Sequence, residues 1–178
     1  MQISTADLWD TIASDAGQES ALWTAALRPR EEQERAPVFS LLGEPQYALG
    51  IETIYEGYLL HYGRTRLFAP EDQDAALLLG DYLYAHGLVR IEEVGSVEAV
   101  SDLAELIALC AYLRAEEITG DGPVWAATAA ALGQGELEEG RSFLRLDNDP
   151  TALERLARAQ AGDAAVDSAL ATHRARLG

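Results

Sequence analysis

Apolar residues recur along most of this chain at intervals of three and four positions, with polar residues between them. Such intervals are typical of helices with one apolar face, whereas strict alternation of apolar and polar residues is typical of a half-buried strand. No sustained alternation occurs anywhere in the sequence. We therefore expect an all-α protein, a helical bundle that forms a single domain over residues 1–178.

Capping residues and helix breakers divide this pattern into separate helices. Ser, Thr, Asp or Pro marks several starts, and Gly or the residue before a Pro marks several ends. The first helix opens at Ser4 or Thr5. The expected helices are 5–28 with a break at Gly17, 45–68, 71–94, 97–118, 124–132, 150–161 and 163–176.

Three glycines interrupt the segment 45–68, at positions 50, 57 and 63. Glycine lowers helix stability because its backbone loses more freedom on folding, but it also lets a neighbouring backbone come close. We expect these glycines to mark a place where another helix packs tightly.

The charge balance is strongly acidic, with 13 Lys and Arg against 30 Asp and Glu and a formal net charge of -17. Every one of the cations is an arginine, so chemistry that needs a lysine, such as a Schiff base, is excluded. A chain with this much negative charge repels the phosphate backbone of nucleic acids and anionic lipid surfaces. We expect neither nucleic acid nor a membrane surface as a partner.

The single cysteine, Cys110, cannot form an intramolecular disulfide, and its place in an apolar helical pattern indicates a buried thiol. No apolar run approaches the roughly 18 residues that a transmembrane helix needs, and the first residues do not have the pattern of a secretory signal. We expect a cytoplasmic protein without a transmembrane segment. His173, near the end of the chain, is expected to be solvated.

Two pairs of carboxylates have the spacing that a metal site on a helix would need. Glu52 and Glu56 are four residues apart, so both project from one helix face and could share a divalent ion. Asp163 and Asp167 have the same spacing, although Asp163 also suits helix capping. No catalytic triad order, phosphate-binding glycine loop or zinc-ligand spacing is present.

The stretch LLLGDYLYAHGL at 77–88 resembles a helix signature of the trans-isoprenyl (polyprenyl) diphosphate synthase family. In that family a metal motif of the form Asp-Asp-x-x-Asp lies upstream at a regular interval, and counting back from Asp81 reaches Glu52 and Glu56. The resemblance covers residues 45–118 without a gap. It implies a truncated isoprenoid-synthase fold.

The departures from the family pattern fall on its charged residues. The middle carboxylate of the metal motif is Thr53, and the family's Leu-Arg-Arg-Gly is matched by Leu60-His61-Tyr62-Gly63. The family's Lys-Thr-Ala has alanine, at Ala127, in place of lysine. Metal ions and these cations supply the electrostatic stabilisation on which ionisation of a diphosphate ester depends. The resemblance therefore implies a degenerate, non-catalytic member, a pseudoenzyme.

From this resemblance we expect an isoprenyl-diphosphate-synthase-like accessory or interaction protein that needs no cofactor. Family members commonly dimerise through the helices that match 71–94 and 97–118. The expected partner is accordingly a second copy of the chain, or a full-length prenyl synthase in a heterodimer.

Three other hypotheses remain open at this point. The chain could bind an isoprenoid or another apolar tail in a pocket whose expected lining is Tyr47, Ile51, His61, Leu78, Leu79 and Tyr82. It could be a residual magnesium-dependent enzyme that uses Glu52, Glu56, Asp81, Asp163 and Asp167. It could also be an unrelated helical interaction domain whose similarity to the family is accidental.

Overall fold

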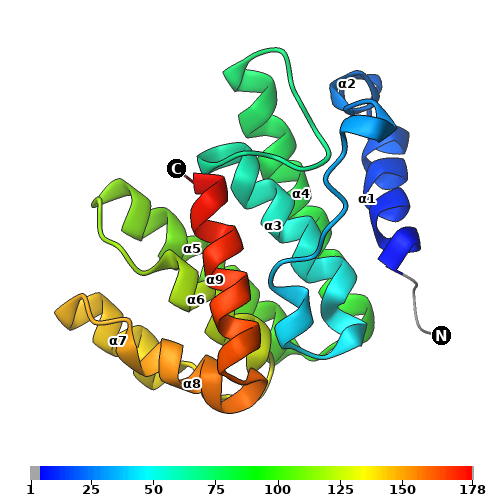
Figure 1. The fold of residues 1–178 in the computed structure, drawn as a ribbon. Coiled ribbons are helices and arrows are strands. Elements are labelled where there is room, and N and C mark those ends of the chain that lie inside the picture. Colours follow the sequence, from blue (N-terminus) through cyan, green and yellow to red (C-terminus); the bar gives the residue numbers. More distant parts are fainter. Residues whose placement is uncertain (1–4, 178) are drawn as a thin grey trace.

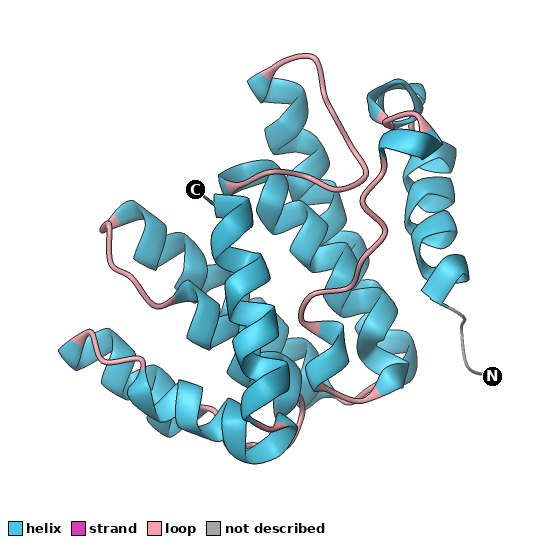
Figure 2. Cartoon of the chain, in the orientation of Figure 1, coloured by secondary structure: helices cyan, strands magenta, loops and turns pink. Residues whose placement is uncertain are grey.

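The computed structural model describes residues 5–177, and within this range it contains nine α-helices and no strand (Figures 1 and 2). This confirms the all-α prediction. The helices are α1 (Thr5–Glu19), α2 (Ala21–Ala26), α3 (Ala48–Tyr62), α4 (Gln73–Val94), α5 (Val97–Ala115), α6 (Asp121–Ala130), α7 (Glu138–Asp147), α8 (Thr151–Ala161) and α9 (Asp163–Leu177). Short 3₁₀ turns lie at Arg30–Glu32, Ser40–Leu42 and Pro45–Tyr47.

The starts of α4 and α5 follow the capping signals of the sequence. The side chain of Asp72 accepts a hydrogen bond from the Ala75 N–H, and Ser96 does the same for Ala99. These bonds satisfy backbone donors that have no partner within the helix. Gly95 ends α4 as expected.

Other boundaries differ from the predictions. The first segment breaks at Ser20, not Gly17, because the Ser20 hydroxyl caps α2; Ser4 lies outside the described residues. The predicted helix 45–68 is helical only to Tyr62, and α5 ends at Ala115 instead of 118. Helix α6 starts three residues earlier than predicted, at Asp121, and α7 was not predicted at all.

Helices α3 and α4 are antiparallel and pack closely at glycines. A Cβ atom on Gly57 would lie 2.9 Å from the backbone oxygen of Gly80, and one on Gly50 would lie 3.1 Å from that of Gly87. These distances leave no room for a side chain, so glycine is required at the crossing. The close packing expected at Gly50 and Gly57 is confirmed.

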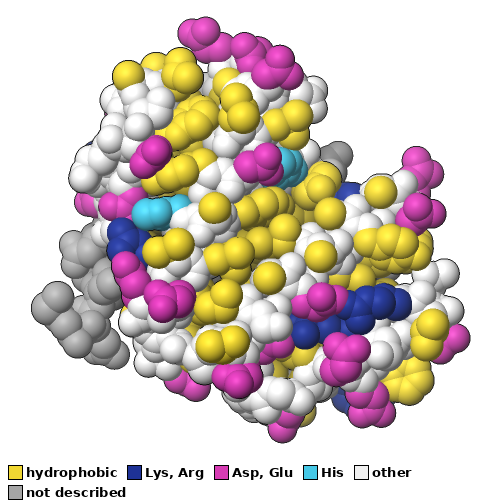
Figure 3. Space-filling view, turned by 180° about the vertical axis from the view of Figure 1, so that it is seen from behind, with side chains coloured by type: hydrophobic (Ala, Val, Ile, Leu, Met, Phe, Trp, Pro, Cys, Tyr) yellow, Lys and Arg dark blue, Asp and Glu magenta, His cyan; other side chains and the backbone are white. Residues whose placement is uncertain are grey.

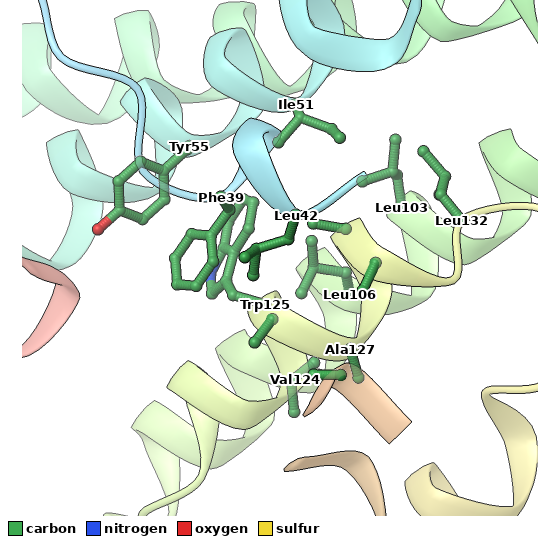
Figure 4. Close-up of a cluster of buried hydrophobic side chains, with 14 of the residues drawn as sticks. Phe39, Leu42, Ile51, Tyr55, Leu103, Leu106, Val124, Trp125, Ala127 and Leu132 are labelled. Carbon is green, nitrogen blue, oxygen red and sulfur yellow. The ribbon is translucent and has the colours of Figure 1, made fainter. Parts of the chain in front are cut away.

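The larger hydrophobic cluster surrounds α3 and contains a group of stacked aromatic rings (Figure 4). The Trp125 ring of α6 stacks on Phe39 at 5.4 Å and meets Tyr55 of α3 edge-on at 5.0 Å. Such offset and edge-on pairs add to the stability that burial alone provides. The aromatic group thus joins α6 to α3 and to the segment before it.

A second, smaller cluster lies between α1 and α2 on one side and α3 and α4 on the other. Trp9 and Ile12 of α1 are buried there, together with Leu79 of α4. Asp15 of α1 also accepts hydrogen bonds from the side chains of His86 and Arg90 of α4. The N-terminal helices are therefore held against α4 by both apolar and polar contacts.

Within residues 5–177, no helix combines the length and the apolar character that crossing a membrane would require.

Candidate functional site

Glu52 and Glu56 lie on one face of α3, as predicted, but that face is fully buried and points at an arginine. Both glutamates and Arg66 have side chains with no solvent exposure. The Arg66 guanidinium bonds to Oε2 of Glu52 through Nη1 and to Oε2 of Glu56 through Nε, the latter at 2.9 Å. One internal cation is thus shared by two internal anions.

Backbone groups complete this buried ion cluster. Oε1 of Glu52 accepts from the N–H groups of Val38 and Ser40, both at 3.0 Å. Oε1 of Glu56 accepts from the N–H groups of Arg66 and Leu67 at 2.9 and 2.8 Å. All four carboxylate oxygens therefore have donors, which is the condition under which buried charges are tolerated.

This arrangement bears directly on the expected metal site. A divalent ion shared by Glu52 and Glu56 would have to displace the Arg66 guanidinium, which already provides the positive charge. In the part of the chain that the structure describes, no three His, Cys, Asp or Glu side chains are grouped so that they could hold a metal ion.

The other predicted carboxylates lie in separate surroundings. Asp81 of α4 is 71% exposed at its side chain, with Oδ1 3.2 Å from Nε2 of His61. Asp163 and Asp167 of α9 both contact Arg158 of α8, at 3.5 and 2.8 Å. None of the three shares a partner with the Glu52 and Glu56 pair, so the five predicted carboxylates do not form one site.

The residues expected to line an apolar pocket are also divided. Tyr47 and Ile51 belong to the larger hydrophobic cluster, whereas Leu79 belongs to the smaller one. Leu78 is 61% exposed on the outer side of α4. Tyr82 is half-buried and stacks on Trp23 and His86, and the His61 ring stacks on Tyr84.

A polar cluster that the sequence did not indicate forms around Asp121, the first residue of α6. Its Oδ2 atom accepts hydrogen bonds from the Tyr58 hydroxyl, from Nη2 of Arg114 and from Nε2 of His173, the last at 3.2 Å. Nδ1 of His173 lies 2.9 Å from the Tyr55 hydroxyl. We call these five residues the Asp121 cluster.

The electrostatics of the Asp121 cluster favour an ionised carboxylate. Burial by itself would raise the pKa of Asp121, but hydrogen bonds from His173 and Tyr58 and the charge of Arg114 hold it well below its usual value. Burial, with the negative charge of Asp121, raises the pKa of Tyr58, so this hydroxyl keeps its proton and donates it.

The Asp121 cluster borders a cavity of about 650 Å³. Its wall comes from the end of α5, the start of α6, and helices α8 and α9. The residues with polar side chains on this wall are Arg114, Thr119, Asp121, Glu154, Arg158, Asp167, His173 and Arg174.

The expectation of a solvated His173 was wrong. The side chain is 2% exposed because α9 folds back against α3 and α6, where its ring meets those of Tyr55, Tyr58 and Phe39. The only sequence signal was the position of His173 on the same helix face as Val166 and Leu170, which are also buried.

Asp121 gives a prediction about pH. Because its folded-state pKa is lowered, its contribution to stability is present above the unfolded pKa, near 3.8, and is lost as pH falls through the folded value. We expect Asp121→Asn to lower the free energy of unfolding by about 2 kcal/mol at neutral pH, because charge-assisted bonds become neutral. Urea titrations at several pH values should show this difference shrinking below pH 3.8. A difference that stays constant down to strongly acidic pH would contradict the assignment.

Comparison of the chain with family models, with curated proteins and with solved structures finds no match.

Proposed function

We propose that this protein is a non-catalytic relative of the isoprenyl diphosphate synthases that acts through protein contacts, using the outer faces of α4 and α5. The non-catalytic part is supported by the buried ion cluster. There the two glutamates that would replace the metal-binding aspartates are neutralised by Arg66 and have no contact with solvent.

The observation that carries the interaction role is an exposed apolar face. On α4, Leu78 and Val89 are 61% and 53% exposed, and on α5, Val97 and Tyr112 are 81% and 44% exposed. Figure 3 shows hydrophobic side chains in a broad patch on this side of the molecule, with acidic groups mainly around it. Monomeric proteins rarely expose large contiguous apolar patches, and such a patch usually marks an interaction surface.

The small side chains of α5 make this face suitable for another helix. Between residues 99 and 113, its most exposed positions are Ser101, Ala104, Ala108, Ala111 and Tyr112, none of them charged. Small residues let a partner helix approach closely, and the missing charges avoid a desolvation cost. We propose a second copy of the chain as the partner, with a full-length prenyl synthase as the alternative.

The test is the oligomeric state of a charge variant. In sedimentation experiments the wild-type chain should have twice its 19.2 kDa mass, and the combined Leu78→Glu and Ala108→Glu variant should be a monomer. In a symmetric dimer each new carboxylate would be buried in the apolar interface without a partner. We therefore expect the dissociation constant of the dimer to rise about 100-fold or more.

The matched control is Leu146→Glu on α7, where the leucine is 82% exposed. This substitution adds one of the same carboxylates outside α4 and α5 and should leave the dimer unchanged, whereas Leu78→Glu and Ala108→Glu, also made singly, should each weaken it. A wild-type chain that sediments as a monomer at every concentration would contradict self-association. The same three substitutions would then test the contact with a full-length prenyl synthase.

A further inference from the structure

The cavity beside the Asp121 cluster has the size and the mixed lining of a small-molecule site. Its volume of about 650 Å³ lies within the range of ligand-binding pockets, roughly 300–1,000 Å³. Pro123 of α6 and Leu170 and Leu177 of α9 give it an apolar side. Arginines from three helices, Arg114, Arg158 and Arg174, give it a polar one.

The three arginines on the cavity wall differ in how many protein partners they already have. Arg158 is bonded to both Glu154 and Asp167, which also line the cavity. Arg114 is bonded to Asp121 and Tyr58 through Nε and Nη2, so within residues 8–177 its Nη1 group has no protein acceptor. Arg174 forms no ion pair with any carboxylate in that same range.

The cavity therefore has spare cationic donors, while each carboxylate on its wall is already bonded to an arginine. The first turn of α6 also lines the cavity, and the start of a helix favours negative charge. These features together select a negatively charged ligand with a limited apolar part.

We infer that this cavity binds a small organic anion, a carboxylate or a phosphate monoester that carries a short apolar group. The anionic head contacts Arg174 and Nη1 of Arg114, and the apolar group lies against Leu170 and Pro123. The Asp121 cluster serves the site by holding the Arg114 side chain in place. This site is separate from the α4 and α5 face and does not depend on the proposed function.

The experiment is calorimetric titration of the whole chain with phenyl phosphate, benzoate and inorganic phosphate. Phenyl phosphate or benzoate should bind saturably at millimolar concentration or below, and inorganic phosphate more weakly because it leaves the apolar side unused. The preferred aromatic probe then distinguishes a phosphate ligand from a carboxylate. Arg174→Gln should weaken binding about 10-fold, since one charge-assisted contact is lost.

Two further variants separate a specific site from general charge attraction. Arg155→Gln on α8 removes the same charge from a side chain that does not line this cavity, so it should leave binding unchanged. Ala171→Trp places a large ring in the cavity from the exposed side of α9 and should abolish binding without unfolding the chain.

Three results would overturn the inference: no saturable binding of either aromatic probe at millimolar concentration, equal weakening by Arg155→Gln and Arg174→Gln, or inorganic phosphate binding as tightly as phenyl phosphate. Thermal denaturation of each variant checks that the fold is intact, so that loss of binding cannot be mistaken for loss of structure.

Discussion

Replacing Arg66 with methionine is expected to lower the free energy of unfolding by about 3–5 kcal/mol, because it leaves the buried carboxylates of Glu52 and Glu56 without their cation. Methionine keeps most of the apolar contacts of the arginine stem and lacks only the guanidinium group, so the loss reports mainly the charge and its hydrogen bonds. Urea denaturation followed by circular dichroism measures the effect.

Arg64→Met is the matched control, since the Arg64 side chain is 60% exposed in its ion pair with Glu34. It should cost no more than about 1 kcal/mol. Adding Glu52→Gln and Glu56→Gln to Arg66→Met should recover part of the lost stability, because glutamine keeps an acceptor oxygen for the backbone N–H groups but carries no charge. If Arg66→Met alone is as stable as the wild type, the ion cluster does not stabilise the fold.

Replacing Trp125 with alanine should have an effect of similar size, a loss of about 3–5 kcal/mol. The side chain is 1% exposed and its ring contacts those of Phe39, Tyr55 and Tyr58 (Figure 4). Removing it leaves a cavity that close-packed neighbours cannot fill and also breaks the aromatic contacts between α3 and α6. The same urea titration detects the loss.

Leu146→Ala provides the comparison for Trp125→Ala, because Leu146 is apolar but 82% exposed. A change within about 0.5 kcal/mol is expected there. Similar losses for the two variants would mean that the aromatic group is not the centre of the core.

Much of the fold could be predicted because local signals and tertiary packing agree. The caps at Asp72 and Ser96 and the terminator Gly95 define α4 and α5 without any knowledge of their neighbours. Helix α7 was missed because its buried residues, Gly140, Arg141 and Leu144, include an arginine and a glycine that give no apolar pattern. Arg141 is buried only because it pairs with Asp102 of α5, which local sequence does not reveal.

The candidate sites were harder to predict, since they depend on contacts between distant residues. The spacing of Glu52 and Glu56 correctly placed both on one helix face, but it could not identify Arg66, which approaches from the loop after α3. In the Asp121 cluster, Tyr58 lies 63 positions before Asp121 and His173 lies 52 after it. Only the folded chain brings these groups together.

The glycines between α3 and α4 have a consequence for how the two helices can move. On each helix the two glycines are seven residues apart, two full turns, so both pairs meet at once only in one alignment. Sliding α4 along α3 by one turn would bring side chains against backbone at both crossings. The register of this helix pair is therefore fixed, so the order in which the exposed side chains of α4 lie along the surface is set before any partner could bind there.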